Sequence, residues 1–239
     1  MAIAYGSQGT IVATEASAGA LSPLCPAAVA ANDILIAFCL YEGTSTTPDT
    51  PSGWDLLGGP YTIESAHRHW IFGKIAAGTE DGAAVPFGTP AVVTMRAAVV
   101  WSFTGWVSGT IAENVPAASF AHLSHATDPQ MPTVTTTVAG ALAVGAVGQV
   151  DDNAQANATG ETGGDWVLAN AQALSAGITP DVSLSVQTCI PTANPGTVTG
   201  GTVATANDPV GVIGFEIRPN LPPPPVPTPN IVMAPMAQF

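Results

Sequence analysis

Apolar and polar side chains alternate with a period of two along much of this chain. Between residues 91 and 103 the odd positions are all apolar, whereas the even positions include Thr94, Arg96 and Ser102. Residues 182–190 alternate in the same way, with serine and glutamine on their polar side. Because successive side chains of a strand point to opposite faces, both segments are predicted to be antiparallel strands with one buried face.

Other segments extend this pattern to the whole chain. Residues 33–41, DILIAFCLY, are apolar on both faces, as expected of a central strand or of one covered by a neighbouring subunit. Turn signals separate further strand-like segments at 67–76, 132–138, 141–150 and 210–217, with shorter ones at 10–15, 54–57, 110–112 and 166–170. Helical periodicity is absent, which predicts an all-β fold, an antiparallel two-sheet sandwich that is jelly-roll-like. Glycine- and threonine-rich segments recur at no fixed period, so no internal repeat is predicted.

The composition changes near Asn220. We predict a β-sandwich domain over residues 1–218 and an extended Pro-rich C-terminal arm over residues 219–239. The run PPPPVPTPN favours polyproline II, which rises about 3.1 Å per residue, so the arm can reach on the order of 60 Å. Beyond this stiff spacer, the arm is predicted to dock on a partner through the apolar residues of its last ten positions, Ile231, Val232, Met233, Met236 and Phe239.

Charged residues are scarce. They make up 9% of the 239 residues, and four basic residues face 17 acidic ones, for a net charge of −13. Nucleic acid and anionic membranes are therefore not expected as partners, because both require clustered lysine and arginine. A lone soluble protein usually carries a surface of mixed charges, so we expect part of this surface to be covered in an assembly.

The cysteines and the N-terminal sequence bear on the cellular compartment. Three cysteines cannot form a full disulfide framework, and Cys39 and Cys189 lie in strand-like segments where a buried, inert thiol is expected. The first ten residues lack a signal-peptide pattern, and no run of 18 apolar residues occurs. We expect synthesis in a reducing cytoplasm without membrane insertion.

Residues with metal-binding or acid–base chemistry are few. His67 and His69 share one face of a predicted strand, but a metal site would need a third ligand from His122 or His125, and a polar sheet surface is the favoured interpretation. The acidic pairs Glu80-Asp81 and Asp151-Asp152 lie at predicted loop tips, where they are interpreted as solvated turn acids.

Catalytic motifs are absent from the sequence. It contains no serine-nucleophile motif, no glycine-rich phosphate loop and no cysteine–histidine pair at a recognisable spacing, so we predict no enzyme activity, no cofactor and no metal. A hydrolase acting on envelope polysaccharide would need an acid–base pair that cannot be identified here. Trp54 and Trp106 follow turn glycines and form a candidate glycan-stacking platform, and their alternative role is to close the ends of the sandwich.

Three segments resemble a pattern found in bacteriophage virion β-sandwich proteins. They are ANDILIAFCLYEGTSTTPDTPSGWDLL, HRHWIFGKIAAGTEDG and VGVIGFEIRP, which match a GDxLIA strand, a P-x-GW turn, a W/Y-x-x-K-x-A strand with an acidic turn, and a closing strand ending in RP. Asn32 replaces the usual glycine of the first element, and the stretch from Trp70 to Lys74 is one residue longer than the tightest version. The resemblance implies a virion component, either capsid-decorating or tail-associated.

The sequence therefore leads to one main expectation and one alternative. The main expectation is a non-enzymatic virion structural protein that decorates or stabilises the capsid as a homo-oligomer, such as a trimer. It would be anchored by its arm to the major capsid protein or to a neighbouring copy. The alternative is a tail or fibre host-recognition module that binds cell-surface glycan through Trp54 and Trp106. The P-x-x-P stretch of the arm also fits an SH3-type ligand, but that interpretation leaves the apolar end of the arm unexplained.

Overall fold

The computed structural model describes residues 2–14, 21–42, 47–63, 67–88, 95–105, 109–116, 118–126, 129–150, 155–174, 182–203 and 208–219. Within these ranges the predicted all-β class is confirmed, since the chain forms thirteen strands and one four-residue helix, α1 (Ile111–Asn114). The last described strand ends at Ile217, and the predicted arm from residue 220 onward lies outside the described residues.

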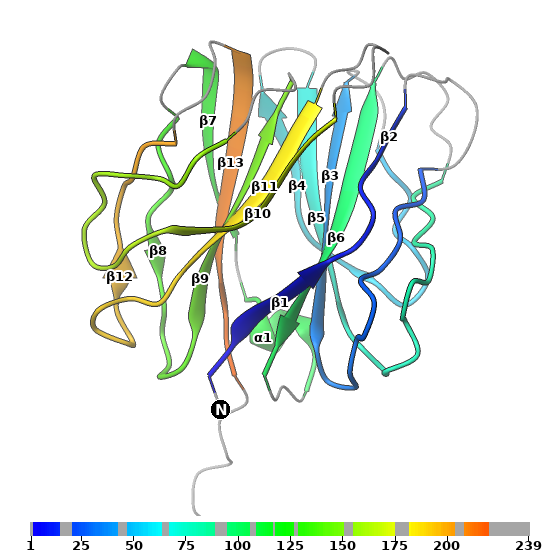
Figure 1. Cartoon of the computed structure of the whole chain (residues 1–239), viewed down its shortest axis with the longest axis horizontal. Helices are drawn as coiled ribbons and strands as arrows, with labels where there is room; N and C mark the ends of the chain where they lie inside the picture. The colour runs from blue at the N-terminus through cyan, green and yellow to red at the C-terminus, as the bar shows by residue number, and fades with distance from the viewer. Residues whose placement is uncertain are drawn as a thin grey trace, which may run out of the picture.

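The strands form two large antiparallel sheets and one small one (Figure 1). The first sheet contains β1 (Ala4–Gln8), β2 (Val12–Thr14), β3 (Ile34–Glu42), β4 (Asp55–Ile63), β5 (His67–Ile75) and β6 (Arg96–Thr104). The second contains β7 (Ala118–Ala126), β9 (Leu142–Gln149), β10 (Val167–Leu174), β11 (Val182–Cys189) and β13 (Asp208–Ile217). The small ribbon pairs β8 (Val134–Thr135) with β12 (Thr197–Val198).

The two large sheets repeat one strand order. The first reads β1-β6-β3-β5-β4, with β2 also on β6, and the second reads β7-β13-β9-β11-β10 from its corresponding edge. Strands β1, β3, β4, β5 and β6 thus have β7, β9, β10, β11 and β13 as equivalents. We call residues 2–105 the first half and residues 118–219 the second half. No internal repeat was predicted from the sequence, and the structure shows one at the level of strand pairing.

The repeat extends to details of register. Between β4 and β5 the pairing shifts register twice, first between Leu56 and Gly58 and again between Gly58 and Tyr61. Between β10 and β11 it shifts once, between Leu168 and Asn170, which is the place equivalent to the first of these two shifts. The segments crossing the outer face of each sheet also pair at equivalent places, through a Leu24–Ala84 bridge in the first half and through β8 and β12 in the second. A shared bulge and a shared outer bridge indicate that the halves have one backbone design.

This strand order does not confirm the predicted jelly-roll-like arrangement. In a jelly roll, successive strands alternate between the two sheets as two Greek keys. Here each large sheet is built from one continuous half of the chain.

The described residues form three apolar clusters, of which only the largest joins the two halves. The largest, the shared core, combines side chains from both sheets, such as Phe38 and Trp101 of the first half with Val186 and Ile213 of the second. A second cluster lies under the outer segments of the first half and includes Trp54 and Phe87. A third lies under the outer segments of the second half and includes Trp166. Trp54 directly precedes β4, and Trp166 directly precedes the equivalent strand β10. Both tryptophans are buried.

One polar contact shows how different residues can keep the same backbone geometry. In the first half, Asn32 N–H donates to the Ala76 carbonyl and Ala76 N–H donates to the Asp33 carbonyl. In the second half, by register, Pro191 takes the place of Ala76 and has no N–H to donate. The Asn194 side chain replaces that peptide, since its Oδ1 accepts from Gly140 N–H and its Nδ2 donates to the Ala141 carbonyl, both at 3.0 Å.

Candidate functional site

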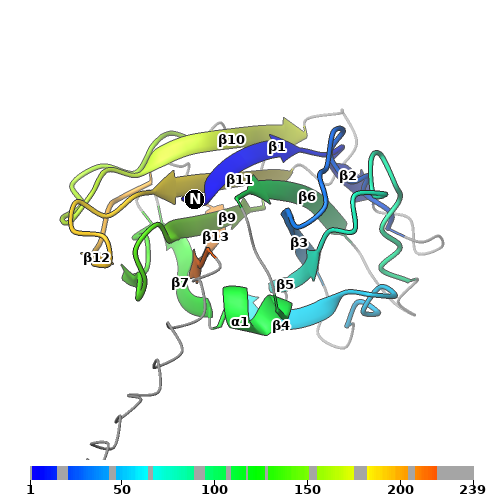
Figure 2. The same cartoon turned by 90° about the horizontal axis from the view of Figure 1, so that it is seen from below.

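The two halves meet along two seams, where an edge strand of one half passes the other half. We call the place where β1 meets the ends of β9, β10 and β11 the first seam. The second seam is the place where β7 meets β4, next to α1. Viewed from below, β1 runs along β10 at one seam, and α1 lies beside β4 at the other (Figure 2).

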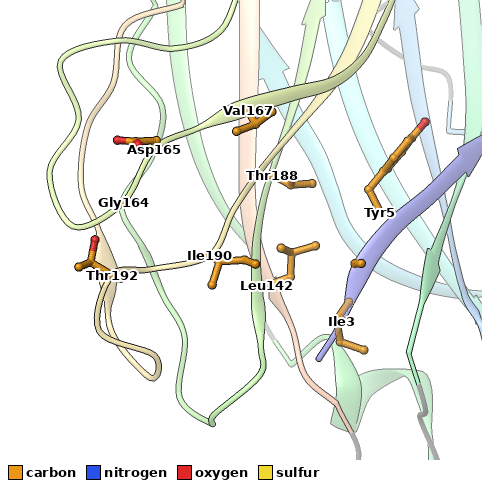
Figure 3. A pocket seen from close by; sticks show the side chains of 10 residues that line it. Ile3, Tyr5, Leu142, Gly164, Asp165, Val167, Thr188, Ile190 and Thr192 are labelled. Atoms are coloured by element: carbon orange, nitrogen blue, oxygen red, sulfur yellow. The ribbon is translucent and has the colours of Figure 1, made fainter. Parts of the chain in front are cut away.

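An open pocket of about 470 Å³ lies at the first seam. Figure 3 shows side chains of β1 on one side of it and those of the second half on the other. Its apolar lining comes mainly from five residues, Ile3, Tyr5, Leu142, Val167 and Ile190. Asp165, Thr188 and Thr192 supply its polar groups.

The pocket has a buried floor and an exposed apolar rim. Ile3 and Leu142 are 2% and 3% exposed, whereas Val167 and Ile190 are 54% and 62% exposed. Val167 and Ile190 are two of the four large hydrophobic side chains that are exposed among the described residues. A pocket of this size with an apolar lining and few polar groups is typical of a site that receives a ligand or peptide. Asp165 is the one carboxylate among the described lining residues, so no acid–base pair lines the pocket.

The equivalent position at the second seam is filled. Ile111 and Val115, at the start and just after the end of α1, are each 4% exposed and belong to the shared core. The Ile111 Cγ1 atom lies 2.8 Å from the point that a Cβ on Gly73 would occupy. Gly73 pairs with Ile36 and Thr188 pairs with Val144, so Gly73 is the register equivalent of the pocket residue Thr188.

The helix that fills the second seam is held by its own capping box. Glu113 N–H donates to Thr110 Oγ1 at 3.3 Å, and Thr110 N–H donates to Glu113 Oε2 at 2.8 Å. Its other end is tied to the end of β13, because Arg218 N–H donates to the Asn114 carbonyl at 2.8 Å. These bonds keep the two apolar side chains of the segment turned toward the shared core.

A second pocket, of about 580 Å³, lies against β1 and includes Gln8, Leu24 and Cys25. Burial raises the pKa of the Cys25 thiol to about 11, with a further contribution from Glu80 that Lys74 partly opposes. The thiol is therefore protonated at neutral pH and is a poor nucleophile. Gln8 is already engaged, since its Oε1 accepts from the Trp101 Nε1–H at 3.0 Å. This pocket shows no catalytic arrangement among its described residues.

Of the residues predicted for docking and for glycan binding, the structure describes Trp54 alone. Ile231, Val232, Met233, Met236 and Phe239 lie outside the described residues, as does Trp106. Trp54 is 8% exposed and packs in the outer cluster of the first half, so its ring does not present a face on which a sugar can stack.

The histidines do not form a described metal site. His69 is fully buried and lies edge-on to Phe38, with ring centroids 5.0 Å apart, and His67 is partly exposed. His122 and His125 lie on β7. Among the described residues no group of three or more histidine, cysteine or acidic side chains is arranged to bind a metal ion.

His69 has a structural role in the shared core. Its Nε2 lies 2.8 Å from the point that a Cβ on Gly148 would occupy, and a Cβ on Gly211 would overlap its ring. The second half thus provides two glycines, on β9 and β13, to make room for this one side chain.

The interpretation of Glu80 as a solvated turn acid is wrong. Glu80 is 6% exposed, forms an ion pair of 2.9 Å with Lys74, and accepts hydrogen bonds from the N–H groups of Ala77, Gly78 and Thr79. Burial alone raises the pKa of the Glu80 carboxyl, but Lys74 and the backbone donors outweigh it and bring the pKa down to about 2. Glu80 therefore fixes the turn after β5. Asp151 and Asp152 lie outside the described residues.

The predicted burial of Cys39 and Cys189 is confirmed, and Cys25, for which no burial was predicted, is buried as well. Cys25, Cys39 and Cys189 are all free and buried. Burial raises the pKa of Cys39 well above its usual range and that of Cys189 to about 11, with Asp165 and Glu161 adding to the latter.

In the part of the chain that the structure describes, no helix is both long enough and apolar enough to cross a membrane. Comparisons with protein-family models, with curated proteins and with solved structures found no match.

The first-seam pocket was not predicted from the sequence. Val167 and Ile190 look like ordinary apolar strand residues there, because nothing in a single sequence shows which strand end stays uncovered. The weak signal available was that Ile190 is followed directly by the turn-forming stretch PTANPG, which places an apolar side chain at a strand end.

Proposed function

We propose that this protein is a non-enzymatic structural component of a bacteriophage virion. In this proposal it decorates or stabilises the capsid as a homo-oligomer, and the C-terminal arm attaches each copy to a neighbouring copy or to the major capsid protein. The body is a two-sheet β-sandwich, an inference supported by the shared core to which both large sheets contribute.

The observation that carries the proposal is the first-seam pocket, an exposed apolar site without a catalytic pair among its described residues. Such a surface is typical of a contact with another protein chain. The scarcity of charge and the uncharged, apolar end of the arm agree with assembly, as does the resemblance of the sequence to virion proteins.

A truncation tests this function. Removing residues 221–239 should leave a body whose circular dichroism and thermal midpoint match those of the full chain, but which no longer joins virions in an infection complemented with the truncated gene. As a matched control, Ile231, Met233, Met236 and Phe239 are replaced by serine in an arm of unchanged length. This control should fail to assemble as the truncation does. Normal incorporation of either variant contradicts an anchoring role for the arm.

The alternative, a tail or fibre module that binds cell-surface glycan through Trp54 and Trp106, has less support because Trp54 is buried. A glycan array with the full chain tests it. Saturable binding that is lost in Trp106→Ala and retained in Trp101→Phe would favour this alternative over the capsid role.

A further inference from the structure

We propose that residues 230–239 of one copy bind in the first-seam pocket of a neighbouring copy. This inference rests on the proposed anchoring function of the arm and names its receptor. Each molecule would then supply the apolar segment that fills the open seam of the next.

The internal repeat identifies the segment that should cover the first seam. After β6 the chain continues into α1, whose Ile111 and Val115 fill the second seam. Strand β13 is the equivalent of β6, so the segment that follows β13 is the equivalent of the one that contains α1. That segment is the C-terminal arm.

The chain leaves the described structure close to the pocket. The Pro219 Cγ atom lies 3.4 Å from the point that a Cβ on Gly140 would occupy. The Gly140 carbonyl accepts a hydrogen bond of 3.0 Å from Ile3 N–H, and Ile3 and Leu142 both line the pocket. The arm thus begins at the edge of the site that the repeat assigns to it.

The length of the spacer favours the pocket of another copy. Residues 221–229 contain six prolines. In polyproline II, nine such residues extend about 28 Å and bend little over that length. A stiff spacer that starts beside the pocket therefore carries residues 230–239 past it, and directs them to a second molecule.

The chemistry of the two partners matches. Residues 230–239 contain no ionisable side chain, so placing them in an apolar pocket removes no charged side chain from water. The exposed Val167 and Ile190 would be covered by Ile231, Met233, Met236 and Phe239. The Asp165 carboxylate and the Thr192 hydroxyl at the rim can accept hydrogen bonds from amide groups of the bound segment.

Cross-linking of full chains tests the contact between copies. Two preparations carry one substitution each, Ile190→Cys in the pocket and Met236→Cys in the arm, and a size tag distinguishes them. Mixed and treated with a short bismaleimide, they should give a heterodimer of both tags. The three native cysteines are buried and should not react. Leu56→Cys is the matched control, because Leu56 is also an exposed apolar residue, at 48%, but lies outside the pocket.

A second measurement tests the role of the apolar rim. In sedimentation velocity, Ile190→Asp in the full chain should weaken self-association at least tenfold, whereas Leu56→Asp should leave it unchanged. The inference is overturned if Met236→Cys cross-links to Leu56→Cys as readily as to Ile190→Cys, or if Ile190→Asp has no effect on self-association. It is also overturned if a chain that carries both Ile190→Cys and Met236→Cys cross-links within itself while the mixed single variants give no heterodimer.

The outcomes also separate this inference from the proposed function. Loss of virion incorporation on truncation, without any cross-link between positions 236 and 190, would mean that the arm has another receptor; the proposed function would then stand and this inference would fail. Normal incorporation of the truncated chain would instead contradict the proposed function itself.

Discussion

The two seams of this protein have the same strand order around them, yet one is filled and the other is open. At the second seam, Ile111 and Val115 are almost fully buried by the shared core. At the first seam, Val167 and Ile190 remain more than half exposed beside a pocket of about 470 Å³. Because the repeat makes the two seams equivalent, the filled seam shows which kind of segment is missing from the open one: a short segment with buried apolar side chains.

The largest expected effects concern the paired tryptophans that support each half. Trp166→Ala should lower the free energy of unfolding by about 4 kcal/mol, since it removes a buried ring. Trp54→Ala should cost about 1 kcal/mol less, because Trp166 also donates from Nε1 to the Gly200 carbonyl at 3.2 Å. Urea unfolding of both variants measures this difference, with Trp→Phe at each site as the milder control. Losses below about 1 kcal/mol would contradict the burial of either ring.

The seams themselves can be compared through two isoleucines. Ile111→Ala should destabilise the chain by about 3 kcal/mol, because its side chain is buried in the shared core. Ile190→Ala should change stability by no more than about 0.5 kcal/mol, since its side chain is 62% exposed. Thermal unfolding at low protein concentration keeps contacts between copies from contributing. Similar losses for the two variants would mean that the first seam is already filled within one chain.

The packing of His69 against the glycines of the second half breaks the symmetry of the shared core. Gly211→Ala should cost about 2 kcal/mol, because the added methyl group overlaps the His69 ring. With His69→Ala in the same chain, the double variant should cost at least about 1 kcal/mol less than the sum of the single variants. Gly214 on the same strand is the matched control. A Cβ there would lie 2.6 Å from Pro132 Cγ, so Gly214→Ala should destabilise the protein without coupling to His69.

The last comparison concerns acid stability, where the effect appears only at low pH. The turn after β5 is fixed by ionised Glu80, whereas the equivalent turn after β11 is fixed by the neutral amide of Asn194. Because the folded pKa of Glu80 lies below its usual value, its contribution is full above about pH 4.5 and is lost as the pH falls toward 2. The stability difference between the wild type and Glu80→Gln should therefore shrink over that range by on the order of 2 kcal/mol. Asn194→Ala should cost about 1 kcal/mol at every pH in the range, and an equal pH dependence of the two variants would contradict the ionic role of Glu80.

Several strands were predictable because their patterns are local. The alternation over residues 182–190 locates β11, but the prediction of a single buried face is wrong, because Ser183, Ser185 and Gln187 are buried as well. The doubly apolar 33–41 segment matches β3, which lies between two strands and contributes to two clusters. The buried state of Cys39 and Cys189 followed from the same patterns. Residues 110–112 were predicted as a short strand and instead include the start of α1, because the Thr110 capping box decides the local conformation.

The repeat itself was hidden, because backbone pairing can be kept while side chains change. Ala76 and Pro191 are equivalent, and the second half keeps the hydrogen bonds only by recruiting Asn194 from three residues further on. Glu80 was misjudged for a related reason, since an acid in a turn looks solvated until its ion pair and backbone donors are seen in space.

The sequence by itself determined the all-β class, the positions of the main strands, the inert cysteines and the uncharged proline-rich end of the chain, because each of these depends on neighbouring residues. Only the tertiary structure decided that the two halves share one strand order, that Trp54 is covered and that Val167 and Ile190 are not. These features depend on which distant segments cover a strand end, and the sequence around a residue does not show which distant segment packs against it.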